Sequence, residues 1–227
     1  MFVRNYRLKT LVQRAMMLLR LPLDYREMHP YRGMQRRAHE DTLDFISAKM
    51  PRAISFQVPR DLLEYALGLI TLEGLVMEFG VFEGKTIDLI ARQLRGRRVD
   101  GFDSFEGLPE PWHGNHMAEG YFKSHVPKVR KNVRLHAGWF SDTLPEFVER
   151  NRGSVAFMHI DCDLYSSTAT LFEHLGDRIV PGTVIVFDEY FNYPGWREHE
   201  YRAFTEFVSR SGCRSTMWVT LLPRLRS

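Results

Sequence analysis

The chain has 227 residues, of which 44% are hydrophobic and 26% charged, and this composition is typical of one globular α/β domain. No apolar run approaches the roughly 18 residues of a membrane-spanning helix, and no repeats occur, which excludes integral membrane and solenoid proteins. The net charge is +3, but residues 1–40 carry nine Lys or Arg against three Asp or Glu, so the remaining chain is mildly acidic and a nucleic-acid partner is not expected.

A basic amphipathic helix is predicted at the start of the chain. Its apolar residues alternate with cationic ones and end before Pro22; the cationic residues are Arg4, Arg7, Lys9, Arg14 and Arg20. Three roles stay open: packing on the core or in a homodimer, peripheral contact of residues 1–21 with an anionic membrane, or targeting. Secretion is disfavoured, because Arg14 and Arg20 would interrupt the apolar core of a signal peptide.

Two more helical segments follow, near residues 38–49 and from Pro59 to Leu72. Pro59 suits the first turn of a helix, and Asp61 is favourable near its positive end. We therefore expect residues 1–70 to form a helical extension in front of a second unit, residues 71–227.

From residue 75 onward, short apolar runs alternate with helical segments. The runs are Leu75–Val81, Arg98–Asp103, Val133–Gly138, Val155–Cys162 and Thr183–Tyr190. The helical segments are Thr86–Leu94, Asp142–Arg150, Tyr165–Arg178 and Trp196–Ser211, followed by a strand-like Ser215–Leu222. Continuous apolar strands separated by helices are typical of a doubly wound, mostly parallel, Rossmann-like α/β sheet, which binds ligands at the carboxyl ends of its strands.

A glycine turn after the first strand predicts a cofactor site. Gly80 and Gly84 would let the chain turn tightly and let a ligand approach the backbone. A P-loop places its second glycine five positions after the first, whereas here the spacing is four, and the dinucleotide pattern Gly-x-Gly-x-x-Gly is absent. Glu78 would repel a pyrophosphate but accept hydrogen bonds from an ammonium group, unless it only caps a helix. A cofactor with an amino-acid end and a cationic centre, such as S-adenosylmethionine, therefore fits best.

Two later strand ends complete the predicted cofactor site. Asp103, about twenty residues beyond the glycine turn, can accept hydrogen bonds from both hydroxyls of a ribose, unless it only forms a turn with Ser104. The third strand ends at Gly138 and Trp139, where a glycine and an aromatic ring could bracket an adenine. The sequence thus predicts cofactor contacts at three consecutive strand ends.

Four carboxylates follow the fourth and fifth strands: Asp161, Asp163, Asp188 and Glu189. Because strands one, four and five are neighbours in a doubly wound sheet, these groups should converge, and their mutual repulsion calls for a cation. Oxygen ligands select hard ions, with Mg²⁺ ahead of Mn²⁺, whereas helix capping would account for only one or two of the four. We expect Asp161, Asp188 and Glu189 to hold the metal and Asp163 to be the general base that activates a hydroxyl group, with His199 as the alternative base.

Five segments resemble the macrocin O-methyltransferase-like enzymes, a family of class I sugar O-methyltransferases that depend on S-adenosylmethionine and a metal. The segments are EFGVFEGKT (78–86), DSFEGLP (103–109), GWFSDTLP (138–145), IDCDLYSST (160–168) and PGTVIVFDEY (181–190). The resemblance covers roughly residues 70–195 and implies methylation of a hydroxyl on a free sugar, a glycoside or an oligosaccharide. It also implies metal ligation by Asp161, Asp188 and Glu189, Asp163 as the base, and cofactor contacts from Glu78, Gly80, Thr86, Asp103, Ser104 and Gly138–Trp139.

The chain departs from this family in two ways. Glu189 stands where the family usually has a second aspartate, which bears on the metal geometry, and the segment 110–131 is shorter than usual, which would open the acceptor side. We expect segment 110–131 to form a mobile lid, with zinc binding by its histidines as the lesser alternative. The aromatic and polar segment 191–201 is predicted to line the acceptor pocket; the alternative is a helix start with core aromatics.

Two other functions stay open beside the sugar O-methyltransferase. One is a catechol-type O-methyltransferase acting on a small phenolic diol, and the other is a non-enzymatic, cofactor-binding partner subunit. The signature of amino-methylating enzymes is absent after the fourth strand. The two cysteines, Cys162 and Cys213, are too few for a disulfide framework or a structural zinc site, which favours a reducing, cytoplasmic setting.

Overall fold

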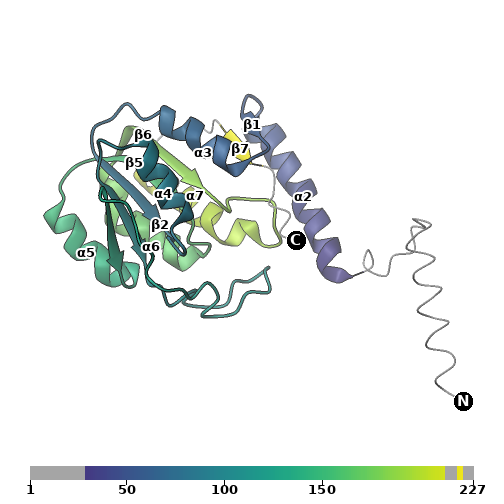
Figure 1. The fold of residues 1–227 in the computed structure, drawn as a ribbon. Helices are drawn as coiled ribbons and strands as arrows, with labels where there is room; N and C mark the ends of the chain where they lie inside the picture. The colour runs from purple at the N-terminus through teal and green to yellow at the C-terminus, as the bar shows by residue number, and fades with distance from the viewer. Residues whose placement is uncertain (1–28, 213–218, 222–227) are drawn as a thin grey trace, which may run out of the picture.

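A computed structural model describes residues 29–212 and 219–221, so the helix predicted within residues 1–21 and the second cysteine, Cys213, lie outside the described residues. The central sheet is entirely parallel and has the spatial order β4-β3-β2-β5-β6. Its strands are β2 (Leu75–Phe79), β3 (Val99–Asp103), β4 (Val133–Ala137), β5 (Val155–Ile160) and β6 (Ile179–Phe187). Figure 1 shows β2, β5 and β6 of this sheet with helices around them. The predicted doubly wound fold is confirmed, including the adjacency of β2, β5 and β6.

Helices cover both faces of the sheet because its strands are apolar on both sides. One face packs against α3 (Pro59–Gly68) and α4 (Lys85–Gln93), through a cluster that includes Val76, Ile87 and Phe157. The other face packs against three helices, through a cluster that includes Met77 and Met158; they are α5 (Phe140–Arg150), α6 (Tyr165–Leu175) and α7 (Glu200–Ser211). All six residues of β5 are buried, as expected for the strand at the centre of two apolar layers. Among the described helices, none is both long and apolar enough to cross a membrane.

The structure differs from the sequence-based elements at both ends of the domain. The first described helix, α2, spans Pro30–Lys49 and so begins eight residues earlier than predicted. The predicted helix Trp196–Ser211 is instead a 3₁₀ turn, η2 (Trp196–Glu198), followed by α7 after a break at His199. A three-residue strand that was not predicted, β1 (Ile54–Phe56), pairs in parallel with β7 (Val219–Leu221) in a separate two-stranded sheet. This pairing crosses the boundary predicted at residue 70.

Helix α2 is fastened to the segment that joins β6 to α7. Two guanidinium nitrogens of Arg197, Nε and Nη2, each donate to one carboxylate oxygen of Asp41 at 2.9 Å. The same guanidinium lies 4.2 Å from the ring centre of Trp196, and Phe45 of α2 packs edge-on against that ring. A bidentate ion pair combined with aromatic stacking holds two elements in one orientation.

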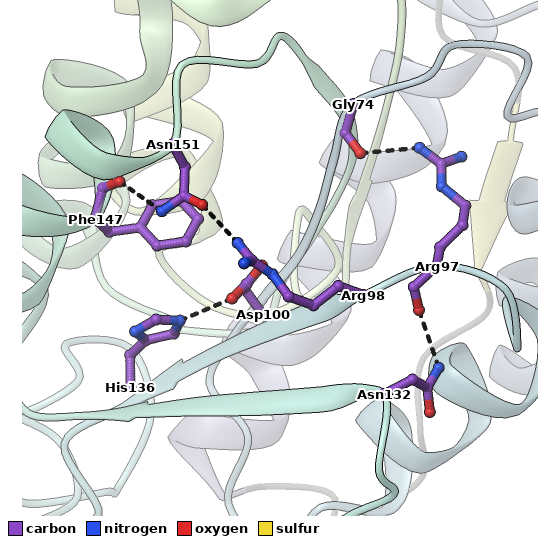
Figure 2. A network of polar contacts seen from close by, with 8 residues as sticks. All are labelled: Gly74, Arg97, Arg98, Asp100, Asn132, His136, Phe147 and Asn151. Atoms are coloured by element: carbon purple, nitrogen blue, oxygen red, sulfur yellow. Dashed lines mark hydrogen bonds and ion pairs between the residues drawn. The ribbon is translucent and has the colours of Figure 1, made fainter.

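A polar network on the side of β3 and β4 serves the fold and contributes no residue to the cavity described below (Figure 2). Asp100 of β3 is buried and accepts hydrogen bonds from Arg98 at 2.8 Å, and its second oxygen lies 2.9 Å from Nε2 of His136 on β4. Arg98 also donates to Asn151 at the end of α5, whose amide donates to the carbonyl of Phe147. The network therefore ties α5 to two strands.

Candidate functional site: the carboxyl edge of the sheet

The carboxyl ends of the strands meet along one edge because the sheet is parallel, and the hydrogen-bond ladders run one residue past three of the strands. The backbone N–H of Gly80 donates to Phe102, that of Asp161 to Phe79, and that of Asp188 to Ile160, at 2.9 to 3.0 Å. The predicted ends of β2, β5 and β6 lie two or three residues further than the structure has them. Those extra residues turn out of the sheet and carry the candidate site.

A cavity of about 550 Å³ opens at this edge, between the ends of β2, β3, β4 and β5. Of the predicted cofactor residues, six line it: Gly80, Thr86, Asp103, Ser104, Gly138 and Trp139. Asp161 and Asp163 line the same cavity, so the predicted cofactor residues and two of the four predicted acids share one space. Residues that sequence reasoning missed also line it: Phe82, Leu108, Phe122, Ser166, Ser167 and Thr170.

The turn after β2 depends on glycine at position 80. Gly80 has φ +91°, and a Cβ added there would lie 1.9 Å from the carbonyl oxygen of Asp161 on the neighbouring strand end. No side chain fits that space, because the obstacle is backbone. Gly84 also has a positive φ and forms the N-cap of α4, but it does not line the cavity, so its predicted cofactor contact becomes a turn-forming role.

We expect Gly80→Ala to destabilise the protein by roughly 2 to 4 kcal/mol, from the strained φ together with the backbone clash. Gly96→Ala is the matched control, because a Cβ there meets nothing within 4 Å. It should change the free energy of unfolding by less than about 0.5 kcal/mol. Urea unfolding followed by circular dichroism compares the two variants. Equal stabilities would show that the turn can relax away from Asp161.

Asp103 holds the two loops that form the cavity wall. Its Oδ2 accepts hydrogen bonds from the backbone N–H groups of Val81 and Phe82, both at 2.8 Å, and its Oδ1 accepts from Phe105 at 2.7 Å. Phe82 and Phe105 both have positive φ, so the carboxylate stabilises conformations that these residues rarely adopt. Asp103 thus organises the loops and, since each carboxylate oxygen has a second lone pair, can also accept from a ligand in the cavity.

Glu78 is placed differently from its prediction. Its side chain has no exposed surface and lies outside the cavity lining, so the expected direct contact with a cofactor ammonium group is corrected. Instead Oε1 of Glu78 lies 3.0 Å from Nδ1 of His159, its register partner on β5. Burial raises the pKa of Glu78, and the hydrogen bond with His159 opposes this only in part. For His159, burial acts to lower the pKa, but Glu78 and the charges of Asp161 and Asp188 outweigh it and raise the pKa to about 9.

The predicted acids do converge electrostatically. Desolvation and then the negative charge of Asp188 raise the pKa of Asp161 well above its ordinary value. A carboxyl group not predicted from sequence, Glu200 at the start of α7, joins them: its pKa is raised first by burial and then by the charge of Asp163. Within residues 29–212 and 219–221, however, no three acidic, histidine or cysteine side chains are gathered closely enough to hold a metal ion. Asp161 and Asp188 thus interact, and Glu189 acts on Glu200, but the three predicted ligands are not gathered into one group.

Asp163 and His199, the two candidate bases, have different surroundings. Asp163 is 5% exposed and lines the cavity. His199 is buried away from the cavity, and its Nε2 lies 2.9 Å from the carbonyl oxygen of His113. Burial lowers the pKa of His199. The structure thus places His199 where it fastens the start of α7 to the loop after β3, and its role as the alternative base stays a prediction.

The aromatic segment 191–201 packs largely in the core and contributes nothing to the lining of this cavity, while its role in an acceptor pocket stays a prediction. Tyr193 and Trp196 are almost fully buried, and Tyr193 packs against Trp112 of the loop after β3. The alternative considered from sequence, a helix start with core aromatics, describes the segment correctly. The physical reason is α2: its Phe45 contacts four rings of this region and turns the segment inward.

The predicted lid, residues 110–131, is partly anchored to the core. Trp112 is 1% exposed, and a Cβ at Gly114 would lie 1.8 Å from the carbonyl oxygen of Pro194. Ser166 at the start of α6 donates a hydrogen bond to Glu110 at 2.6 Å, which joins the loop to the cavity rim. Phe122 lines the cavity and packs edge-on against Phe82. After Met117 the segment is tied back as well, because the N–H of Gly120 donates to the carbonyl of Leu108 and the N–H of Ser124 to that of Phe105.

The site combines a glycine turn, an acid at the next strand end and a cavity at the crossover between β2 and β5. This combination is typical of doubly wound α/β proteins that bind a nucleoside-containing cofactor at the sheet edge. The chain belongs to the methyltransferase-domain family, whose model matches residues 77–190. This match spans the cavity-forming segments from β2 to β6 and confirms the methyltransferase resemblance that the motifs indicated.

Curated relatives are O-methyltransferases by name. An 8-demethyl-8-(2,3-dimethoxy-alpha-L-rhamnosyl)-tetracenomycin-C 4'-O-methyltransferase of Streptomyces olivaceus is 32% identical over 57% of this chain. A mycinamicin III 3''-O-methyltransferase of Micromonospora griseorubida is 30% identical over 57% of the chain. The matched regions cover 59% and 60% of those two proteins, so this chain spans about three fifths of their length.

Solved structures support the fold. The calicheamicin methyltransferase CalS11 aligns with a TM-score of 0.56 and 24% identity over 95% of this chain and 88% of its own. The O-methyltransferase NovP aligns with a TM-score of 0.55 and 21% identity over 70% of this chain and 75% of its own. At these identities the likeness establishes the Rossmann-like architecture.

Proposed function

We propose that this protein is an O-methyltransferase that moves the methyl group of S-adenosylmethionine to a hydroxyl group of a sugar, free or within a glycoside or oligosaccharide. The observation that carries the proposal is that the glycine turn and Asp103 line the same cavity as Asp161 and Asp163. A cofactor in the first part would present its reactive methyl group toward the acids in the second.

The cavity fits S-adenosylmethionine in size and chemistry. A volume of about 550 Å³ lies within the usual range for small-molecule sites. Asp103 offers acceptor capacity for ribose hydroxyls, while Trp139, 39% exposed on the cavity wall, offers a ring face to an adenine. The buried Glu78 and the acids beyond it give the region a negative potential suited to a sulfonium and an ammonium group.

The chemistry of Asp161, Asp188 and Glu189 fits a hard divalent cation, because a cation would reverse the repulsion that raises the pKa of Asp161. Such an ion, Mg²⁺ or Mn²⁺, would supply charge that orients acceptor oxygens and lowers the pKa of the acceptor hydroxyl. The three side chains would need to close around it by rotamer changes, since they are not gathered as ligands in the structure.

Asp163 is the group proposed to take the proton. It lines the cavity, where the acceptor hydroxyl would lie between Asp163 and the methyl group. As the hydroxyl oxygen bonds to the methyl carbon, the carbon–sulfur bond breaks with its electron pair moving to sulfur, and the hydroxyl proton passes to Asp163. The aromatic Phe82 and Phe122 beside the cavity would exclude water from the reacting centre.

A sugar acceptor is favoured over a phenolic diol by the named acceptors of the relatives, one of which carries a rhamnosyl group. Ser166, Ser167 and Thr170 of α6 line the cavity with hydroxyl groups, which suit a polyhydroxylated acceptor better than a flat aromatic one. A cytoplasmic homodimer, with residues 1–21 at the dimer contact or on a membrane surface, belongs to the same proposal.

Isothermal titration calorimetry with S-adenosylhomocysteine, followed by Mg²⁺, tests the proposal. We expect the wild type to bind S-adenosylhomocysteine in the micromolar range and then to bind Mg²⁺. The double variant Asp188→Ala, Glu189→Ala should still bind S-adenosylhomocysteine but should no longer bind Mg²⁺. If the wild type binds S-adenosylhomocysteine but does not bind Mg²⁺, the mechanism would rely on Asp163 as a base and on no metal. If it does not bind S-adenosylhomocysteine, the proposed function is overturned.

A further inference from the structure

Asp163, the proposed proton acceptor, lies at the centre of a strained turn. The backbone N–H of Leu164 donates to the carbonyl of Cys162 at 2.6 Å, two residues back, and Asp163 between them has φ +64°. A hydrogen bond from residue i+2 to residue i around a positive φ is the rarer, strained form of the γ-turn. Such a conformation costs about 1 to 3 kcal/mol and persists only where surrounding contacts hold it.

One contact that holds the turn comes from α7. The backbone N–H of Asp163 donates to Oε1 of Glu200 at 3.2 Å, across 37 positions in the chain. Glu200 has no exposed surface, and its helix start is itself fixed, because His199 lies against the carbonyl of His113 and accepts from the N–H of Ala203. A rigid carboxyl group therefore meets the one backbone donor of the strained residue.

A carboxyl group at position 200 is costly to bury. Its second oxygen, Oε2, is buried without a hydrogen-bond partner, and its pKa is raised well above the ordinary value by burial and by Asp163. An apolar residue of similar size would avoid this desolvation cost. What the carboxyl group does provide is an acceptor for the backbone N–H of Asp163 at the strained turn.

We propose that Glu200 is a positioning residue that holds Asp163 in its left-handed turn, so that the Asp163 carboxylate faces the acceptor in the cavity. The inference rests on the proposed function, because it assigns Glu200 a role through Asp163 as the base. Glu200 itself does not line the cavity. It extends the site to α7, a helix beyond the segment matched by the family model.

Two variants of Glu200 separate the hydrogen bond from packing. Glu200→Gln keeps a carbonyl oxygen that can accept from the N–H of Asp163, and it mimics the neutral form of a buried carboxyl group. Glu200→Met keeps the size of the side chain and removes the acceptor. Phe207→Leu is the matched control for lost packing, since Phe207 is buried on the same helix and stacks on Phe172 rather than on the turn.

Hydrogen exchange measured by mass spectrometry reports on the turn without any acceptor substrate. We expect peptides covering residues 161–165 to exchange at least tenfold faster in Glu200→Met, and at the wild-type rate in Glu200→Gln and Phe207→Leu. Unchanged protection in Glu200→Met would overturn the inference even if the protein is a methyltransferase. If Glu200→Met does not fold, Glu200→Gln is compared with a Glu200→Ala variant instead. Slower exchange of residues 161–165 in Glu200→Gln than in Glu200→Ala would support the role of the hydrogen bond, and equal exchange in the two variants would overturn the inference.

Methyl transfer from S-adenosylmethionine to a rhamnoside tests the catalytic half. We expect Glu200→Met to lower kcat by roughly 10- to 100-fold, with the S-adenosylhomocysteine affinity unchanged and with Glu200→Gln within about threefold of wild type. In an Asp163→Asn background, Glu200→Met should change kcat less than twofold, because both act on the same step. Additive effects would contradict a role through Asp163. A wild type that binds S-adenosylhomocysteine but leaves rhamnosides unmethylated would refute only the acceptor class of the proposed function.

Discussion

Asp163→Asn is expected to lower kcat for methyl transfer by about 10² to 10⁴-fold, while the affinity for S-adenosylhomocysteine changes by less than about threefold. The carboxylate is the cavity group proposed to take the proton of the acceptor hydroxyl, and an amide of the same size cannot take it. Asparagine tolerates a positive φ better than almost any residue except glycine, so the turn at φ +64° should form in the variant.

The rate is measured under saturating cofactor and acceptor, so that the loss is read as a loss in the chemical step. Asp177→Asn is the matched control, because Asp177 lies exposed just beyond the far end of α6, an 11-residue helix about 16 Å long. It should leave kcat unchanged. If Asp163→Asn kept kcat within threefold of wild type with the melting temperature unaltered, the proton acceptor would lie elsewhere and Asp163 would be a turn residue only.

Much of the fold could be predicted because the strands of the sheet are continuous apolar runs. Val155–Ile160 is buried at every position, and only a central parallel strand gives that pattern over so short a length. The strand ends were placed too late because Gly80, Val81 and Cys162 are as apolar as the strands before them. Their residue types do not reveal that they leave the ladder to form the cavity.

The sequence itself indicates the Glu78–His159 pair, although the pair is not among the predictions made from it. Each residue is a polar interruption in an otherwise apolar run, and each occupies the fourth or fifth position of a strand next to the other in the sheet. A buried charged group needs a partner, so two such interruptions on neighbouring strands predict a pair. The prediction that Glu78 contacts a ligand does not take His159 into account as its partner.

Two features depend on contacts between distant segments that local patterns do not encode. The strand pair β1–β7 joins residues 54–56 to 219–221, and three residues are too few for a periodicity to show. Glu200 looks like an ordinary acid in the first turn of a helix, where acids are favoured at the surface. Only the packing of α7 beside α6 buries it against Asp163.

Breaking the Glu78–His159 pair is expected to have the largest effect on stability of any substitution in the sheet. Both side chains are at most 4% exposed, and their Oε1 and Nδ1 atoms lie 3.0 Å apart between β2 and β5. Glu78→Leu leaves the buried imidazolium without its partner and should cost roughly 3 to 5 kcal/mol in the free energy of unfolding. Glu78→Leu combined with His159→Leu removes both charges and should recover most of that loss. If the double variant were no more stable than Glu78→Leu, packing rather than charge would govern these positions.

The same pair predicts how stability depends on pH. The folded-state pKa of His159 is about 9, against 6.5 for an ordinary histidine, so the folded protein holds this proton more tightly than the unfolded chain does. The stabilisation is therefore complete below pH 6.5 and is lost as the pH rises through 9, by about 3 kcal/mol in all. Urea unfolding of the wild type between pH 6 and 10 should show this fall. In the Glu78→Leu, His159→Leu double variant the fall should be smaller by that amount, whereas parallel pH profiles would show that His159 is not charged in the folded protein.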